Sequence, residues 1–361
     1  MADNLYLAID FGRNGGSGDD KGTERPWNRS DPPFWASSSI WVDPGGTEAH
    51  TGEPTVVKVR VSNRGDQTVK DVAVQAWAFV PQVGVINTPG NAKVSFRSPT
   101  RDVAPGSGTL SNSDPHVFTC LPEWTPTEAD LPPGQTELHM CIMANAFQDP
   151  AVADPPPPGE ELDGTEWPSG NEVQPNGDGH VGQRNITLKK VPRAIAAEPV
   201  RVPYHTYPPT PPPHGPFLRE LLVSATTVTP RDVLGPDEYF VLAGHPEIVA
   251  PERENEQQQP ELMLRTSYGT EPVRVGESRL SFRLDAEGIP GLDRNFVPPR
   301  PESQAQSQSG YGEKGIPSEL LISLESDPVV GSVHTFDITL QDAEEGTVVG
   351  AGLRVMILIT E

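Results

Sequence analysis

Cysteine, basic residues and long apolar runs are all scarce in this chain of 361 residues. It has 2 cysteines, Cys120 and Cys141, which are too few for a fold held together by disulfides. Lys and Arg total 27 against 50 Asp and Glu, and the formal net charge is −23. Because phosphate binding needs clustered Lys and Arg, this balance argues against nucleic acid and anionic membrane surfaces as partners.

Targeting and membrane signals are also missing from the sequence. The opening segment, MADNLYLAIDFGRN, has no basic region followed by an apolar run, which a secretory signal requires. No apolar stretch approaches the roughly 20 residues of a membrane helix. We therefore expect a soluble chain without membrane insertion, made in the cytoplasm and then either incorporated into a particle or exported by a non-standard route.

Proline and glycine, in contrast, are abundant, with 42 and 34 copies. These numbers exceed average usage but stay below the low-complexity range, so we expect a folded chain with long irregular connections. The length of 361 residues allows two domains, each with its own core.

Strand patterns fill the first half of the chain. Val57, Val59 and Val61 alternate with polar residues, which is typical of a strand with one buried face. Residues 69–80 are apolar in both phases, which predicts a central strand covered on both faces. Further strands are expected over residues 5–11, 93–97, 116–124, 136–147 and 180–191.

The second half repeats this pattern after a proline-rich stretch. Seven of the fifteen residues in 202–216 are proline, which predicts an extended, stiff spacer. Residues 353–360 are apolar at nearly every position and predict a central strand, whereas residues 217–225 fit either a strand or a helical turn. Other strands are expected over residues 239–244, 261–269, 278–288, 318–326 and 332–342.

These patterns predict an all-β protein made of two immunoglobulin-like antiparallel β-sandwich domains with long Pro/Gly-rich loops. An extended segment over residues 1–35 precedes the first sandwich, at 36–200, which contains a long polar loop at 149–179. A proline-rich linker at 201–216 then leads to the second sandwich, at 217–361.

Part of the first half resembles a known family. Residues 37–79 contain a short I-W-V strand followed by V-R-V-S-N-R-G, similar to the opening strands of bacterial CARDB modules, which are cell-adhesion-related and immunoglobulin-like. LHMCIMANAF and HVGQRNITL are similar to the closing strands of the same modules. The resemblance covers about residues 36–191 and implies an immunoglobulin-like sandwich without indicating a ligand. The C-terminal half shows no such resemblance.

The glycine-rich stretch GGSGDDKG, residues 15–22, follows the first part of a calcium-binding β-helix repeat. That repeat binds calcium by stacking several copies, each with a large apolar residue where this chain has Gly22. One copy without the apolar residue predicts no calcium at Asp19 and Asp20. Asp20, Gly22 and Pro26 instead look similar to the lead-in that precedes the I-W-V strand of CARDB modules.

The two cysteines leave three interpretations open. His139 and Cys141 together with Cys120 supply three zinc ligands without a fourth. A disulfide between Cys120 and Cys141 is the second interpretation. The third is a pair of reduced thiols, because the apolar phase of residues 138–144 puts Cys141 on the opposite strand face from the one that Cys120 shares with Phe118.

No recognised catalytic motif occurs, and acidic pairs such as Glu160 and Glu161 lie in polar segments. We therefore assign no catalytic, cofactor or metal residues and no cofactor. Trp77 is expected in the sandwich core. Trp27, Trp35 and Trp167 lie in irregular segments, where they either cover a sheet face or form an exposed platform for a sugar or protein.

The leading functional hypothesis is a non-enzymatic structural or interaction protein, an accessory or subunit of a larger assembly such as a phage-like or extracellular particle. Its partners would be other proteins or further copies of the chain. The alternative is a module that binds carbohydrate or another surface ligand through exposed aromatic side chains. An enzyme with an unrecognised site is the third hypothesis.

Overall fold

The computed structural model of the chain describes residues 7–9, 35–44, 48–49, 51–84, 92–109, 111–130, 138–148, 179–196, 198–207, 221–228, 261–266, 269–273, 275–276, 279–284, 316–324, 330, 333–342 and 348–361. Strands dominate these ranges, and the helices described are the short 3-10 turns η3 (Glu128–Asp130) and η4 (Arg193–Ile195). None of the described helices is long and apolar enough to span a membrane. The all-β prediction is confirmed.

The described residues of the first part of the chain contain thirteen strands. They are β1 (Leu7–Ala8), β2 (Ile40–Asp43), β3 (Glu48–Ala49), β4 (Thr55–Arg60), β5 (Ser62–Asn63), β6 (Val69–Phe79), β7 (Gln82–Gly84), β8 (Val94–Arg97), β9 (Arg101–Val103), β10 (Val117–Trp124), β11 (Leu138–His139), β12 (Cys141–Gln148) and β13 (Val181–Pro192). One sheet places β6 between β12 and the pair β8 and β9, and a facing layer contains β2, β4 and β10. Two short pairs, β1 with β5 and β3 with β11, stand beside these layers.

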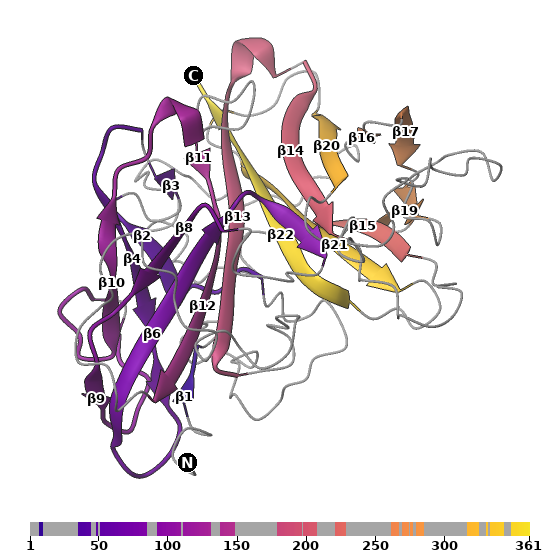
Figure 1. Ribbon diagram of the computed structural model, residues 1–361. Coiled ribbons are helices and arrows are strands. Elements are labelled where there is room, and N and C mark those ends of the chain that lie inside the picture. Colours follow the sequence, from indigo (N-terminus) through magenta and orange to yellow (C-terminus); the bar gives the residue numbers. More distant parts are fainter. Residues whose placement is uncertain are drawn as a thin grey trace, which may run out of the picture.

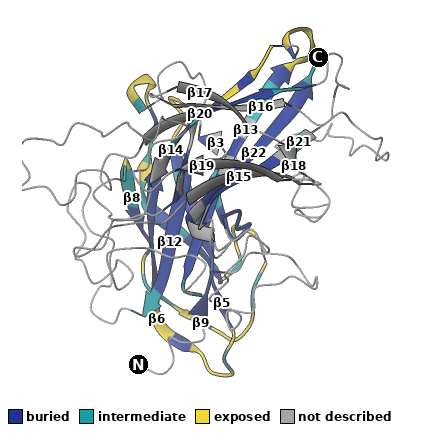
Figure 2. Ribbon diagram, turned by 90° about the vertical axis from the view of Figure 1, so that its right-hand side faces the viewer, coloured by how far each residue is buried: buried dark blue, intermediate teal, exposed yellow. Residues whose placement is uncertain are grey.

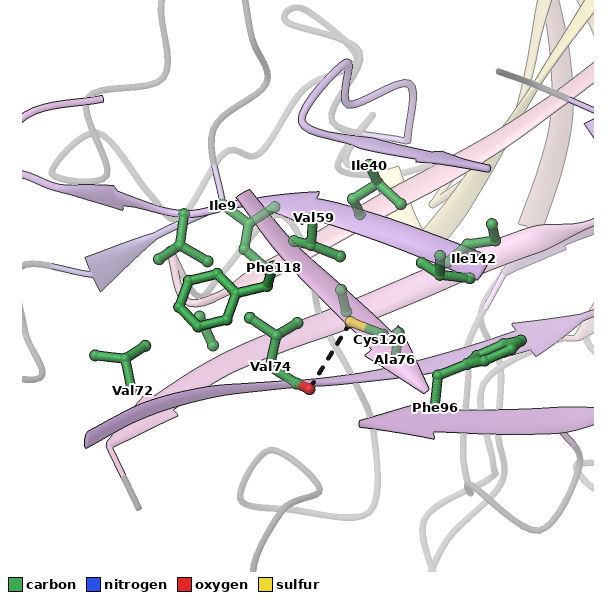
Figure 3. Close-up of a cluster of buried hydrophobic side chains, with 14 of the residues drawn as sticks. Ile9, Ile40, Val59, Val72, Val74, Ala76, Phe96, Phe118, Cys120 and Ile142 are labelled. Atoms are coloured by element: carbon green, nitrogen blue, oxygen red, sulfur yellow. Dashed lines mark hydrogen bonds between the residues drawn. The ribbon is translucent and has the colours of Figure 1, made fainter. Parts of the chain in front are cut away.

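The first core lies between these two layers, as the alternation of Val57, Val59 and Val61 predicts. All three side chains are buried together with Ile40, Phe118 and the apolar even-numbered residues of β12, Ile142, Ala144 and Ala146. Figure 3 labels Val59, Ile40, Phe118 and Ile142 in this cluster. β6 is buried on both faces from Val72 onward, which confirms the prediction of a covered central strand. A smaller cluster on the opposite face of β6 and β12 contains Trp77, Phe79, Cys141, Met143 and Val181. Trp77 is therefore buried, but outside the sandwich core where it was expected.

The second part of the chain adds β14 (Val200–Tyr207), β15 (Leu221–Val228), β16 (Glu261–Thr266), β17 (Gly269–Val273), β18 (Val275–Gly276), β19 (Arg279–Leu284), β20 (Ile316–Ser323), β21 (Val333–Asp342) and β22 (Val348–Thr360). One sheet runs from β22 through β21 and β15 to β19, and the facing sheet contains β7, β14, β20, β16 and β17. The segment left open between strand and helical turn forms the strand β15 from Leu221 onward.

The second core lies between β14 and β20 on one side and β21 and β22 on the other. Val202, Ile322, Phe336 and Val355 are among its buried side chains. β22 pairs with β13 on one edge and β21 on the other, so the prediction of a central strand at 353–360 is confirmed.

The strand β13 joins the two halves of the molecule. Its residues 181–185 pair with β12 in the antiparallel sense, and its residues 186–192 pair with β22 in the parallel sense. Figure 1 shows β13 between β12 and β22, and Figure 2 shows these three strands buried along most of their length. The antiparallel prediction therefore holds for most pairings, with parallel exceptions at β13–β22 and β14–β7.

Side-chain alternation in β13 puts the two cores on opposite faces of one continuous sheet. Gly182 faces the first core, because a Cβ at this position would lie 2.2 Å from Ile9 Cγ2. Val181 and Val191, at odd positions, belong to the small Trp77 cluster and to the second core. Since successive side chains of a strand point to opposite faces, the first core and the second core cover different sides of β13.

Part of the predicted linker is also a strand. Residues 201–207 lie within β14, which pairs with β20 along seven residue pairs from Val200 to Thr206 and with β7 from His205 to Tyr207. Proline at position 203 is accommodated within this strand. Residues 208–216, the remainder of the predicted linker, lie outside the described residues.

We predict that residues 217–361 expressed alone do not fold. β22 would lose β13 and β20 would lose β14, and with them the buried side chains of Val191, Val200, Val202 and Tyr204. Each such side chain contributes about 1.5–3 kcal/mol, and the sum is comparable with the whole stability of a domain, about 5–15 kcal/mol. Amide dispersion in the NMR spectrum of this fragment is the measurement. A dispersed spectrum would show that the second half folds without β13 and β14.

Candidate functional site

Trp35 stands at the centre of a buried group of polar residues where β13 changes partners. Its side chain is fully buried, and its Nε1 donates a hydrogen bond to Asp337 Oδ1 at 3.3 Å. The backbone nitrogen of Asn185 donates to the carbonyl oxygen of Trp35 at 2.8 Å. Trp35 thus contacts β13 through its main chain and β21 through its indole, across 302 positions of sequence.

The indole of Trp35 lies directly on the backbone of β22. A Cβ at Gly352 would stand 2.3 Å from Trp35 Cδ2, so any larger residue at this position would displace the ring. The close approach explains why a glycine interrupts a strand that is otherwise rich in large apolar residues.

Asp337, which accepts the hydrogen bond of the indole, forms a charged pair with Arg354 across the neighbouring strands β21 and β22. Arg354 donates from Nε to Asp337 Oδ1 and from Nη2 to Asp337 Oδ2, both at 2.7 Å. The Arg354 side chain is fully buried and that of Asp337 is 10% exposed. Two parallel hydrogen bonds to one carboxylate fix the guanidinium in orientation as well as in position.

Asn185 completes the group at the position where β13 leaves β12. Its Nδ2 donates to the carbonyl oxygens of Gln82, at 2.5 Å, and of Gly352, at 2.6 Å. One amide therefore connects β13 to β7 and to β22. We call Trp35, Asn185, Asp337, Gly352 and Arg354 the Trp35 junction.

The sequence patterns did not identify the Trp35 junction, although one signal was present. Arg354 is a charged residue inside LRVMILIT, a stretch that was expected to be a central strand. A charge buried in such a strand requires a partner of opposite sign, and that requirement points to an acidic residue on a neighbouring strand. Asp337 fills that role opposite Arg354 in the register of β21 and β22.

The two cysteines considered for zinc are not brought together. Cys120 lies in the first core and Cys141 in the small cluster on the opposite face of the sheet. His139 belongs to β11, which pairs with β3, whereas Cys141 begins β12. Among the described residues, no group of three or more His, Cys, Asp or Glu is placed to hold a metal ion.

Both cysteines are free and buried, which agrees with the interpretation as reduced thiols. Burial raises the pKa of Cys120 to about 12 and that of Cys141 to about 12. At neutral pH both side chains are therefore protonated, and a thiol is a far weaker nucleophile than a thiolate. Cys120 points its Sγ toward the carbonyl oxygen of Val74 at 3.9 Å (Figure 3), and Gln183 Nε2 donates to Cys141 Sγ at 3.2 Å.

Trp35 fits the first of the two hypotheses for the tryptophans. Its side chain covers a sheet and is not part of an exposed platform. Trp27 and Trp167 lie outside the described residues, as do the calcium candidates Asp19 and Asp20. Glu160 and Glu161 also lie outside them.

A second charged cluster holds the loop before β10. Asp114 Oδ2 accepts hydrogen bonds from the backbone nitrogen and the hydroxyl of Thr109, at 2.8 and 2.9 Å. Asp114 Oδ1 accepts from the backbone nitrogen of His116 at 2.9 Å and lies 3.1 Å from its Nδ1. Burial disfavours the ionised carboxyl, but these hydrogen bonds outweigh it and lower the pKa of Asp114 to about 2.

We predict that replacing Asp337 alone is far more damaging than replacing the pair. Asp337→Asn leaves the Arg354 charge buried without its counter-ion, at a cost of about 3–5 kcal/mol. The double variant Asp337→Leu with Arg354→Met removes both charges and should cost less than half as much. Urea unfolding of the two variants and the parent measures this difference. Equal losses in both variants would contradict the buried ion pair.

We also predict an acid-dependent contribution from Asp114. Because its pKa is lowered on folding, the stabilisation is complete above the unfolded value of about 3.9 and is lost as pH falls toward 2. Asp114→Asn should therefore be less stable than the parent at pH 6, by about 1–2 kcal/mol, and the difference should shrink toward pH 2. Urea unfolding across this range is the measurement. A difference that stays constant with pH would contradict it.

No family model matches the chain, and no curated protein does. Among solved structures, the B domain of a biofilm associated protein is similar at a TM-score of 0.20 and 9% identity, covering 90% of this chain and 86% of that one. The BSP domain of a biofilm associated protein has a TM-score of 0.21 and 9% identity, with 95% and 61% covered. A partial N-terminal region of an enterococcal surface protein has a TM-score of 0.23 and 6% identity, with 98% and 100% covered. At these TM-scores the likeness supports no conclusion about the fold or function of this chain.

Proposed function

We propose that the chain is a non-enzymatic structural or interaction protein that serves as a subunit or accessory of a larger assembly. The observation that carries this proposal is the Trp35 junction. The indole of Trp35 and the amide of Asn185 bind the first half to β21 and β22, and β13 contributes residues to both cores. Buried polar groups are thus used to join the two sandwiches.

This connection supports a role that needs a fixed shape. Domains in one chain move relative to each other unless their interface is large and well packed. Here the two sandwiches share a strand of 12 residues, so a change of angle between them would break main-chain pairing. A body of fixed shape holds binding surfaces at constant separation, which suits a component that is incorporated among other subunits.

The type of partner is proposed from the sequence resemblance over residues 36–191. CARDB modules are cell-adhesion-related, and we propose protein partners or further copies of the chain by analogy with that family, although the resemblance itself indicates no ligand. The formal charge of −23 further favours partners that are not themselves strongly acidic.

The burial of Trp35 weakens the hypothesis that exposed tryptophans bind carbohydrate. Trp35 is one of the three side chains considered for such a platform. It is fully buried and contacts β21 and β22. A glycan-binding role would have to use other residues.

The size of the native particle tests the proposed function. An epitope-tagged chain, extracted from its source cells without denaturant, is expected in a megadalton fraction on gel filtration. The same chain purified alone is run on the same column as the matched control. A monomer in both samples would contradict the proposal, and retention of that monomer on a glycan column would support the carbohydrate hypothesis instead.

A further inference from the structure

The short strand β1 fills a slot in the first core. Leu7 and Ile9 are 2% and 0% exposed and belong to the same apolar cluster as Ile40 and Phe118. Figure 3 shows Ile9 in this cluster beside Ile40 and Phe118. β1 pairs with β5 through Leu7 opposite Asn63 and Ala8 opposite Ser62. The backbone nitrogen of Ile9 also donates to the carbonyl oxygen of Gly179 at 2.9 Å.

The slot is shaped for the side chain of Ile9. A Cβ at Gly182 would stand 2.2 Å from Ile9 Cγ2 and 3.1 Å from Ile40 Cδ1, so the missing side chain at 182 provides the space that Ile9 occupies. We call this slot, bounded by β5, Gly179, Gly182 and Ile40, the β1 groove. It combines an apolar pocket with main-chain partners, which is how a sheet recognises an added strand.

Main-chain pairing to β1 is short compared with that of its neighbours. The β1–β5 ladder has two residue pairs, whereas β6 and β12 share eight. Residues 10–34 separate β1 from Trp35, and a chain of that length can span on the order of 80 Å when extended. The groove therefore holds a segment that a long stretch of sequence separates from Trp35 and whose described strand pairing is a ladder of two residue pairs.

We propose that the β1 groove binds residues 7–9 of a second copy of the chain, so that copies link by exchanging this strand. The occupant is defined by the groove itself, because Leu7 and Ile9 of another copy make the same contacts as those of the same copy. Exchange then loses no contact, and its entropic cost falls as the local concentration of copies rises. The inference rests on the proposed assembly function and specifies how copies join.

Cysteine cross-linking distinguishes exchange from retention of the strand. Ala8 and Ser62 are directly opposite in an antiparallel pair, and such pairs have the Cα separation that a disulfide requires. Ala8→Cys and Ser62→Cys are placed in separate full-length chains, mixed at high concentration and oxidised. We expect the mixture to give at least about tenfold more cross-linked dimer than either variant alone, because only exchange between the two variants places a cysteine at position 8 opposite a cysteine at position 62. The natural thiols of Cys120 and Cys141 are buried and do not compete.

The double variant, with both cysteines in one chain, is the control for geometry. A bridge within this chain together with no dimer from the mixture would overturn the proposal. Gel filtration across a concentration series gives a second readout that needs no cysteine. The parent and Ile9→Val should form dimer at high concentration. Ile9→Ser puts a polar side chain into the apolar slot and should empty the groove in every copy, so the chains remain open monomers and the dimer fraction is at least tenfold smaller. A parent that stays monomeric at every concentration would also overturn the proposal.

The same variants separate this inference from the proposed function. Should cells carrying Ile9→Ser still yield the megadalton fraction, strand exchange is wrong and the assembly function stands. Should the parent yield no such fraction while the cysteine mixture cross-links, exchange stands and the assembly function is wrong.

Discussion

The structure depends on one constraint, which is that β13 belongs to two cores at once. Its first five residues pair with β12 and its last seven with β22. Because side chains alternate between faces, even positions such as Gly182 serve the first core and odd positions such as Val191 serve the second. The facing layers β2, β4 and β10, and β14 with β20, must then lie on opposite sides of one sheet.

Apolar burial and the Trp35 junction have different roles within this arrangement. The two large clusters of Val, Ile, Leu and Phe provide the driving force for folding. The Asp337–Arg354 pair adds little net stability, since its Coulombic gain must offset the desolvation of two charges. The hydrogen bonds that cross between the halves, from the indole of Trp35 to Asp337 and from the amide of Asn185 to Gly352, are directional and are satisfied in one placement of β21 and β22 against β13. We infer that the junction selects the relative position of the two halves.

Local patterns in the sequence predicted the individual strands well, but not how they are connected into sheets. Alternation at Val57, Val59 and Val61 and the continuous apolar run of β22 report the burial of one strand at a time, and both predictions are confirmed. The change of pairing partner within β13 produces no recognisable sequence pattern, because the residues on either side of Asn185 continue the same strand pattern. The proline content of residues 202–216 likewise concealed β14. The interactions of Trp35 were hidden because its partner Asp337 lies 302 positions away.

The parallel pairing of β13 with β22 has a mechanical consequence. A pulling force between the C-terminal end of β22 and the first core acts along both strands in opposite directions and loads their ladder in shear. All seven residue pairs from Ile186–Arg354 to Pro192–Thr360 then resist together, instead of opening one after another as they would if the strands were peeled apart. Tension along β13 and β22 is therefore distributed over all the residue pairs of their ladder, and rupture requires the simultaneous loss of the ladder's hydrogen bonds.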